Sequence, residues 1–239
     1  MGKYQVRVHT FLQEVETTID KKTIGRQLVL EVTDAISVKP TYFFSLQYDT
    51  KDGRRKFLSL EKAVLDHKID HRHKSLHLYL RLRVHPPNPG DIQQEKTKLI
   101  IYRELKQAVE TGEMNCTAKT HDDLSNFSKH DRMEDYLNTV AENVESYGIE
   151  RYNMKRDDGY PVLLSVSLSG MAIKAGTATS EIPFSKLKQA ARGRKSLTIV
   201  PVAPAADVKL LGPDSSFVKE VQETIMVNYY VHKQLLGTI

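Results

Sequence analysis

The spacing of apolar residues changes twice along this chain of 239 residues, and the change limits the folds open to it. Apolar and polar side chains alternate in residues 4–9 and 76–84, which predicts half-buried strands. Between about residues 92 and 144 apolar residues recur every three or four positions, as in amphipathic helices. Short strand-like runs return after residue 151. The order predicts an α+β protein larger than one average domain of about 100–200 residues.

The first segment, residues 1–86, predicts a ubiquitin-like β-grasp lobe. Its expected order is strand, strand, helix and three more strands, at residues 4–9, 15–19, 24–36, 43–48, 56–58 and 76–84. Thr23 precedes the helix as an expected N-cap, because its hydroxyl accepts a hydrogen bond from a free amide of the first turn.

A proline-rich stretch at residues 86–90 predicts a linker to a second lobe. Residues 90–147 predict a shortened helical lobe of two helices, at about residues 92–109 and from about residue 131. The stretch between them, residues 116–130, is polar and lacks periodicity, so we expect a loop there.

The third segment, residues 148–239, predicts a pleckstrin-homology or PTB-like β-sandwich with a C-terminal helix. Strand-like runs at residues 162–167, 170–173, 181–184 and 197–200 are separated by turn residues. Asp214 is expected to cap a long helix whose apolar side packs on the sheet.

Charge is spread unevenly over the three segments. The formal net charge of the chain is +5. Lys and Arg exceed Asp and Glu by six in residues 1–88 and by four in residues 148–239, whereas acidic residues exceed basic ones by five in residues 89–147. A basic surface attracts nucleic acid, anionic lipid or acidic partners, and charge alone does not choose among them.

Several stretches resemble the FERM family, closest to its merlin and ezrin/radixin/moesin group. Tyr42-Phe43-Phe44-Ser45-Leu46-Gln47-Tyr48 and the stretch from Phe57 to His67 are similar to the first FERM lobe. Residues 97–109 and 136–149 resemble helices of the FERM middle lobe. Parts of the third lobe are similar to residues 159–171, 182–187 and 214–233. The resemblance implies a three-lobed domain that acts as an adaptor between membrane and cytoskeleton.

The sequence also departs from the family pattern. Phe57 stands where the family usually has Trp, and Asn228-Tyr229 stands where it usually has Asn-His. The middle lobe is too short for the family's four-helix core. The chain lacks an actin-binding tail after the last helix, so direct actin binding is not implied.

The resemblance implies a lipid site, since the ezrin-like group binds an inositol phosphate headgroup between its first and third lobes. This role carries over to Lys62 and Lys219. Other basic positions of the family are replaced, by Ser59, Ala63 and Gln222. Arg54, Arg55 and Lys56 follow a turn and add positive charge. A solvated basic face explains most of these charges equally well, because each contributes only about 1 kcal/mol near an anionic leaflet.

The resemblance also implies a groove in the third lobe, where cytoplasmic tails of adhesion or other membrane receptors add a strand. The residues mapped to it are Leu187, Lys188, Gln189 and Ala190 on the strand, and Phe217, Val221 and Ile225 on the helix. Packing in the core is the competing explanation for Val221 and Ile225.

Nothing in the sequence predicts an enzyme, a cofactor or a metal site. His67, His71, His73 and His77 lie close together, but a solvated polar face explains them without a metal. Cys116 is a lone cysteine, which fits a reducing compartment and carries no nucleophile pattern. Phosphate-binding glycine loops, CxxC and Gly-x-Ser-x-Gly are absent from the sequence.

The sequence shows neither a signal peptide nor an apolar run of about 20 residues, so we expect a cytoplasmic protein, peripheral at the plasma membrane and cell cortex. Its leading interpretation is a non-enzymatic adaptor that binds phosphoinositide lipid and receptor tails. The alternatives are a truncated regulatory or decoy form, and the targeting module of a phosphatase or kinase, which needs a catalytic domain elsewhere. Nucleic acid ranks last, because no recognition-helix pattern supports it.

Overall fold

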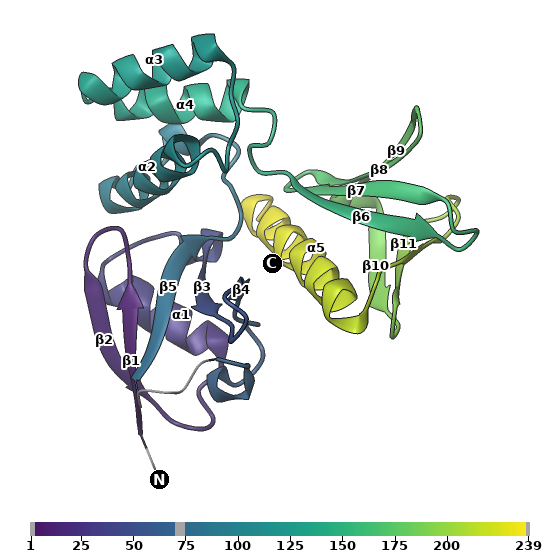
Figure 1. Ribbon diagram of the computed structural model, residues 1–239, viewed down its shortest axis with the longest axis horizontal. Helices are drawn as coiled ribbons and strands as arrows, with labels where there is room; N and C mark the ends of the chain where they lie inside the picture. Colours follow the sequence, from purple (N-terminus) through teal and green to yellow (C-terminus); the bar gives the residue numbers. More distant parts are fainter. Residues whose placement is uncertain (1–2, 70–74, 238–239) are drawn as a thin grey trace. The chain divides into compact units, whose positions relative to one another are not determined.

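The computed structural model describes residues 3–69 and 75–237. The chain forms two compact units, residues 1–147 and residues 148–239 (Figure 1). Among the described residues, unit 1 contains a five-stranded sheet and four α-helices, and unit 2 contains a seven-stranded sheet with one α-helix. The fold class is α+β, as the sequence predicted. The division into three lobes at residues 86–90 and 147–148 stays a prediction.

The sheet of unit 1 has the strand order β2-β1-β5-β3-β4. Its strands are β1 (Tyr4–His9), β2 (Glu14–Ile19), β3 (Phe44–Asp49), β4 (Arg55–Phe57) and β5 (Ser75–Leu82). β1 and β5 pair in parallel, whereas β1–β2, β3–β5 and β3–β4 are antiparallel. This mixed sheet with one crossing helix is the predicted β-grasp arrangement.

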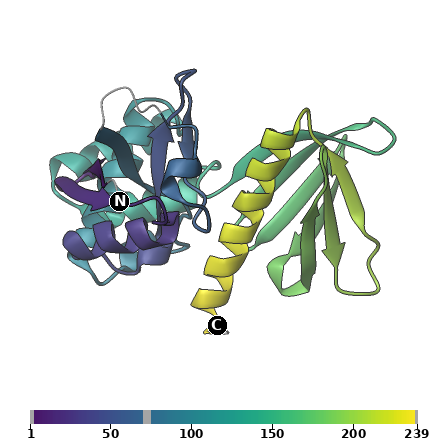
Figure 2. The ribbon, with the colours of Figure 1, turned by 90° about the horizontal axis from the view of Figure 1, so that it is seen from below.

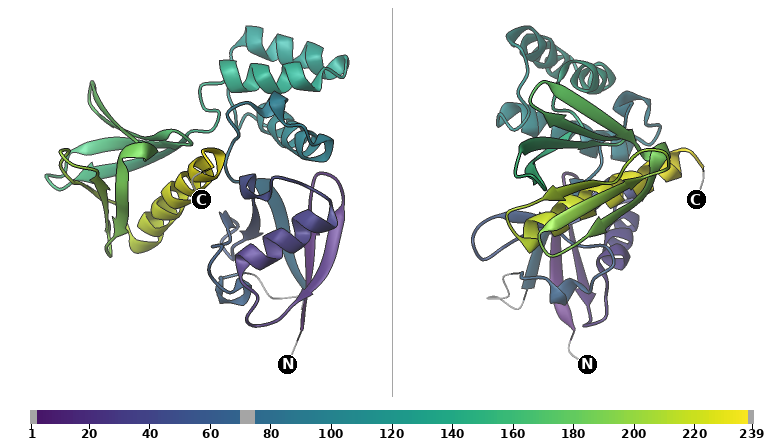
Figure 3. Two further views of the ribbon diagram at one scale, coloured as in Figure 1. Left: turned by 180° about the vertical axis from the view of Figure 1, so that it is seen from behind. Right: turned by 90° about the vertical axis from the view of Figure 1, so that its right-hand side faces the viewer.

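Helix α1 (Gly25–Ala35) lies on one face of this sheet (Figure 3). Leu28 and Val32 of α1 are fully buried together with Val8 and Leu78 of the sheet. The helix begins one residue later than expected, with Ile24 in the N-cap position and no side-chain cap. The expected capping role of Thr23 was wrong, because its hydroxyl accepts the Asp20 amide (3.1 Å) in the preceding turn.

The helical segment of unit 1 contains three α-helices, not two. They are α2 (Glu95–Glu110), α3 (Ala118–Lys129) and α4 (Met133–Asn143). The loop expected at residues 116–130 was therefore wrong. Thr117 caps α3 by accepting the Thr120 amide (3.2 Å), and only Thr120 and Leu124 of this helix are buried. With so narrow a buried stripe, α3 lacks the apolar periodicity that reveals a helix in sequence.

A nearly buried lysine joins two of these helices. Lys98 of α2 is 4% exposed and forms an ion pair with Glu134 of α4. The hydrogen bond from Lys98 to the Glu134 carboxylate raises the pKa of Lys98. Val140 and Leu137 of α4 and Ile101 of α2 are also buried, so apolar packing and this charge pair hold the segment together.

Unit 2 has a seven-stranded antiparallel sheet with the order β10-β11-β12-β6-β7-β8-β9. The strands are β6 (Glu150–Arg156), β7 (Pro161–Ser167), β8 (Gly170–Ala175), β9 (Ala178–Pro183), β10 (Leu187–Arg192), β11 (Ser196–Pro201) and β12 (Val208–Leu211). Helix α5 (Ser215–Leu235) follows and runs along the sheet (Figure 2). β6 and β12 were not expected from the sequence.

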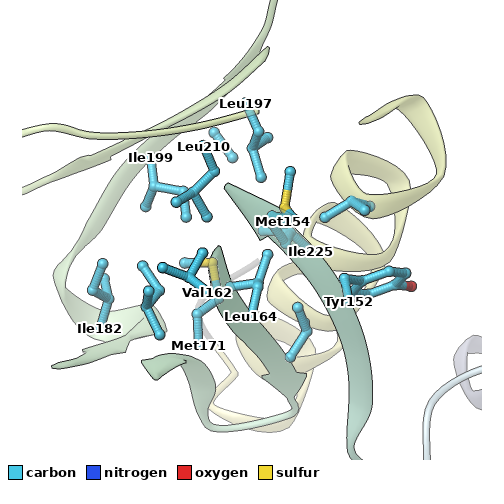
Figure 4. Packing of buried hydrophobic residues seen from close by; sticks show 14 of the residues in the cluster. Tyr152, Met154, Val162, Leu164, Met171, Ile182, Leu197, Ile199, Leu210 and Ile225 are labelled. Carbon is cyan, nitrogen blue, oxygen red and sulfur yellow. The ribbon is translucent and has the colours of Figure 1, made fainter. Parts of the chain in front are cut away.

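The core of unit 2 lies between the folded sheet and α5 (Figure 4). Leu164, Leu197, Ile199 and Leu210 of the strands and Ile225 of the helix are fully buried in it. Gly170 allows the β8–β9 hairpin to close, because a Cβ atom there would lie 2.5 Å from the Ile182 carbonyl oxygen. Its φ of +149° is also a backbone angle that side chains disfavour.

Candidate functional site

Strand β10 is an edge of the unit 2 sheet, because it pairs only with β11. Its register shifts between Leu187 and Gln189, which marks a β-bulge. An edge strand presents backbone donors and acceptors to an added strand. β9 is the other edge of the same sheet. The predicted tail-binding strand thus has the sheet position that strand addition requires.

The seven residues mapped to the tail groove fall into two groups. Leu187, Ala190, Val221 and Ile225 are buried, with exposed fractions of 7%, 6%, 0% and 0%. They form part of the unit 2 core and hold α5 against β10. Lys188 and Gln189 are exposed, and Phe217 is partly buried at the margin of the core.

The four buried residues support the edge strand from the core, and their part in tail binding stays a prediction. Their side chains point into the core, so they position the edge strand and do not line an open groove. The reason is geometric, since a helix that covers a sheet must bury one face of its own. The groups that remain for a ligand are the backbone of β10 and the side chains along its solvent side.

Gln222 is a residue of this region that sequence reasoning placed elsewhere. Its side-chain amide donates a hydrogen bond to the carbonyl oxygen of Ala190 (2.9 Å), which joins α5 to β10. A backbone acceptor of the edge strand is therefore occupied by a side chain of the same unit. The sequence alone does not predict this contact, since it shows only that Gln222 stands where the family has a basic residue.

One side-chain cluster caps α5, and a second joins the helix to a strand. The Asp214 carboxylate accepts hydrogen bonds from the amides of Ser216 (2.8 Å) and Phe217 (2.9 Å), which confirms the predicted cap. The Tyr152 hydroxyl of β6 lies 2.8 Å from the Thr224 hydroxyl of α5 and donates to Glu150 (2.7 Å). The Asp214 cap therefore orders the first turn of α5, and the Tyr152–Thr224 contact ties the middle of the helix to β6.

The basic residues at the β3–β4 turn differ in their surroundings, and their role in lipid binding stays a prediction. Arg54 pairs with Asp52 within the turn, and the Thr50 hydroxyl and Arg54 lower the pKa of Asp52 to about 2. Arg55 and Lys56 are consecutive on β4, so their side chains leave opposite faces of the sheet.

The two lysines carried over from the family each have a local partner. The Lys62 ammonium group donates to the carbonyl oxygen of Asp66 (2.6 Å). Lys219 lies 3.5 Å from Glu223, one turn along α5. Lys62 belongs to unit 1 and Lys219 to unit 2. A shared lipid site formed by them stays a prediction.

The histidine region contains structural contacts. Nε2 of the buried His67 accepts a hydrogen bond from the Ser59 amide (2.9 Å). His71 and His73 lie outside the described residues. Within residues 3–69 and 75–237, no cluster of three His, Cys, Asp or Glu side chains has the geometry to hold a metal ion. Cys116 is a partly exposed free thiol.

Among the described residues, no helix combines the length and the apolar character that crossing a bilayer requires.

Comparisons of sequence agree on the family. Residues 12–70 match the FERM N-terminal domain. The moesin/ezrin/radixin homolog 1 proteins of Culex quinquefasciatus and Aedes aegypti are each 28% identical over 136 residues, which are 56% of this chain. The protein 4.1 homolog of Drosophila melanogaster is 25% identical over 122 residues, or 51% of the chain. The matches span 24%, 23% and 7% of the three relatives, respectively.

Solved structures show the same fold over the whole chain. The FERM and C-terminal domain complex of Drosophila Merlin superposes with a TM-score of 0.84 at 16% identity, covering 98% of each chain. The MyTH4-FERM MF2 domain of Dictyostelium discoideum myosin VII has a TM-score of 0.65 at 10% identity, covering 98% of this chain and 60% of that one. The chain therefore has the fold of a FERM domain, and residues 12–70 match the FERM N-terminal domain. In sequence it is related to moesin/ezrin/radixin homologs and to a protein 4.1 homolog.

Proposed function

We propose that this chain is a non-enzymatic membrane–cytoskeleton adaptor that binds cytoplasmic tails of membrane receptors along β10. FERM-domain relatives are typically adaptors without enzymatic activity. The observation that carries the proposal is the position of β10, a bulged edge strand beside α5. Strand addition at such an edge uses backbone hydrogen bonds for affinity and neighbouring side chains for specificity.

The hydrogen bond from Gln222 to Ala190 limits how a tail can pair with β10. A tail that pairs with β10 at Ala190 has to displace the Gln222 amide or bind around it. Exchange of one hydrogen bond for another costs little, whereas an unreplaced one leaves a buried acceptor unpaired. We therefore expect recognition of an extended tail whose own amide takes the place of Gln222.

Anionic lipid is the second ligand of the proposed adaptor, and it would bring the chain to the plasma membrane and cell cortex. The support is the net basic charge of the first and third sequence segments. Lys62 and Lys219 remain the proposed headgroup residues, with Arg54, Arg55 and Lys56 adding charge. A competing decoy role, in which the chain occupies partners of a longer relative, uses the same two ligands.

Binding of a juxtamembrane peptide from an adhesion receptor, measured by fluorescence anisotropy, tests the tail site. Gln189→Pro removes an amide at the bulge of β10, a position where sheets tolerate proline. Ser180→Pro is the matched control on the other edge strand, β9. We expect at least a tenfold loss of affinity for Gln189→Pro alone. Equal affinity of both variants and the unaltered chain would contradict the proposal.

Co-sedimentation with vesicles tests the lipid arm. Vesicles that contain phosphatidylinositol bisphosphate are compared with phosphatidylserine vesicles of equal total charge. A preference for the inositol lipid that Lys62→Glu or Lys219→Glu removes supports a headgroup site. Binding that depends only on total charge contradicts it and leaves the tail site unaffected.

A further inference from the structure

A hollow of about 880 Å³ lies on the unit 2 sheet, on the face turned away from the core. On β6, β7 and β8 the core-facing residues Met154, Val162 and Ile173 are buried. Their neighbours along each strand therefore have side chains on the opposite, outer face. The outer-face side chains that line the hollow are Asn153, Lys155, Pro161, Leu163, Lys174 and Leu211.

Strand register arranges these six residues in two rows across the sheet. The rows are Leu211, Lys155 and Pro161 in one, and Asn153, Leu163 and Lys174 in the other. Lys155 and Lys174 are thus two strands and two residues apart, which separates their Cα atoms by about 12 Å. The half-buried Leu163 lies between them on β7. We call this hollow with its two lysines the lysine hollow.

The charge of the two lysines is not balanced within the described part of the chain. Both side chains are exposed, and among the residues that the structure describes no carboxylate lies within ion-pair distance of either. The neighbouring cations differ, because Lys209 pairs with Asp157 (3.3 Å) and Arg156 pairs with Asp158 (3.6 Å). The lysine hollow therefore attracts an anion from outside unit 2.

The hollow suits carboxylates better than phosphates. A phosphate group is bound best where several backbone amides converge, as at a helix N-terminus. Helix α5 begins just after Pro213, which lines the hollow, but its amides at Ser216 and Phe217 donate to the Asp214 carboxylate. Each lysine is therefore left as a single point charge, which suits a group with one negative charge.

The position of the hollow within the sheet favours a small molecule over a peptide. The strands β12, β6, β7 and β8 are each paired on both sides, so none of them offers a free edge to an added strand. The volume of the hollow falls within the range of small-molecule sites, about 300–1,000 Å³, which are mostly apolar with a few polar groups. Leu163, Leu211 and Pro161 supply the apolar part here.

We propose that the lysine hollow binds an elongated dicarboxylate, an apolar chain with one carboxylate at each end. The chain covers Leu163 between the two lysines, and each carboxylate pairs with one lysine. Covering a half-exposed leucine removes apolar surface from water, which favours binding. The site is separate from β10 and from Lys62 and Lys219, so it does not depend on the proposed adaptor function.

Isothermal titration calorimetry of the full chain with dodecanedioate tests the proposal. We expect Lys155→Gln and Lys174→Gln each to weaken binding about threefold, and the double variant about tenfold, because an exposed ion pair contributes only modestly. Lys186→Gln is the matched control. It makes the same charge change at an exposed lysine of unit 2 that precedes β10 and does not line the hollow, and it should leave binding unchanged.

Ligands of different length separate the apolar contribution from charge. Adipate carries the same two carboxylates on a shorter chain, so it should bind at least tenfold more weakly, since it covers less apolar surface. A thermal unfolding midpoint within 2 °C of the unaltered chain shows that a variant remains folded. If the double variant fails this criterion, the two single variants and adipate decide the question.

Several outcomes would overturn the proposal. They are no binding of dodecanedioate at millimolar concentration, an equal loss of affinity in Lys186→Gln and the two hollow variants, and equal affinity for adipate and dodecanedioate. Tighter binding of inositol trisphosphate that Lys155→Gln or Lys174→Gln abolishes would also overturn it, because the hollow would then be a phosphate site.

Discussion

The two sheets of this molecule are each covered by one helix, yet they differ in what they leave for a ligand. In unit 1 the sheet ends at the short edge strands β2 and β4, and three of its arginines lie against aromatic rings. In unit 2 the corresponding feature is the backbone of β10, beside a helix that fills the core. Side-chain recognition selects charge, whereas backbone recognition selects an extended shape. These features of the two units therefore offer different chemical groups to a ligand, side chains in unit 1 and the backbone of an edge strand in unit 2.

The cores of the two units should unfold separately. Ile225→Ala removes a fully buried side chain from unit 2 and should lower its free energy of unfolding by about 2–5 kcal/mol. Leu78→Ala is the corresponding change in unit 1. Hydrogen exchange of β7 should speed up only in the first variant, and exchange of β1 only in the second. Acceleration of both strands in either variant would show that the units are one cooperative body.

Glu104 should make unit 1 sensitive to pH. Burial raises the pKa of Glu104 to about 7, well above its ordinary value of 4.5. The folded state then holds a proton that the unfolded state releases, so stability falls as pH rises from about 4.5 to 7, by on the order of 1–3 kcal/mol.

The comparison with Glu104→Gln isolates this effect. His85, which is partly buried, acts in the opposite direction, because desolvation lowers its pKa to about 4 and stability falls as pH drops below about 6.5. His85 is present in both proteins, so the difference in urea unfolding between them reports Glu104 alone. A difference that does not change between pH 4.5 and 7.5 would contradict the assignment.

The helix caps provide a smaller contrast between the units. Asp214→Ala should destabilise unit 2 by about 1 kcal/mol, because the amides of Ser216 and Phe217 lose their acceptor. Thr23→Ala should have a smaller effect on α1, since Thr23 does not cap that helix. Thermal unfolding of the two variants measures both effects, and an equal loss of stability would count against the difference in capping.

Exposed ion pairs should have the smallest effect. Arg7 and Glu16 lie 2.7 Å apart across β1 and β2, and Lys209 and Asp157 lie 3.3 Å apart in unit 2. Glu16→Gln and Asp157→Asn should each change stability by less than about 1 kcal/mol, because solvent screens such pairs. Urea unfolding at low and high salt checks this. A change above 2 kcal/mol would indicate a structural role for the pair.

Strong periodicity made much of the fold predictable from sequence. Most strands of the unit 1 sheet and the helices α1, α2, α4 and α5 agree with alternating or helical apolar patterns. The misses have physical causes. Helix α3 buries only Thr120 and Leu124, and β12 has four residues, so neither has a periodic pattern long enough to recognise.

The site was harder to predict than the fold. A pattern of apolar residues identified Val221 and Ile225, but it does not tell core positions from groove positions. The Gln222–Ala190 contact and the stacks of Arg55 and Arg83 join residues far apart in sequence or across strands. Such contacts depend on strand register, which single-residue propensities do not specify.

Hydrogen–deuterium exchange of the full chain with and without a receptor-tail peptide tests the central claim most directly. The account predicts slower exchange of β10 amides on binding, with unchanged exchange in β9 and in β1 and β5 of unit 1. Protection of β9 or of the unit 1 sheet without protection of β10 would contradict it.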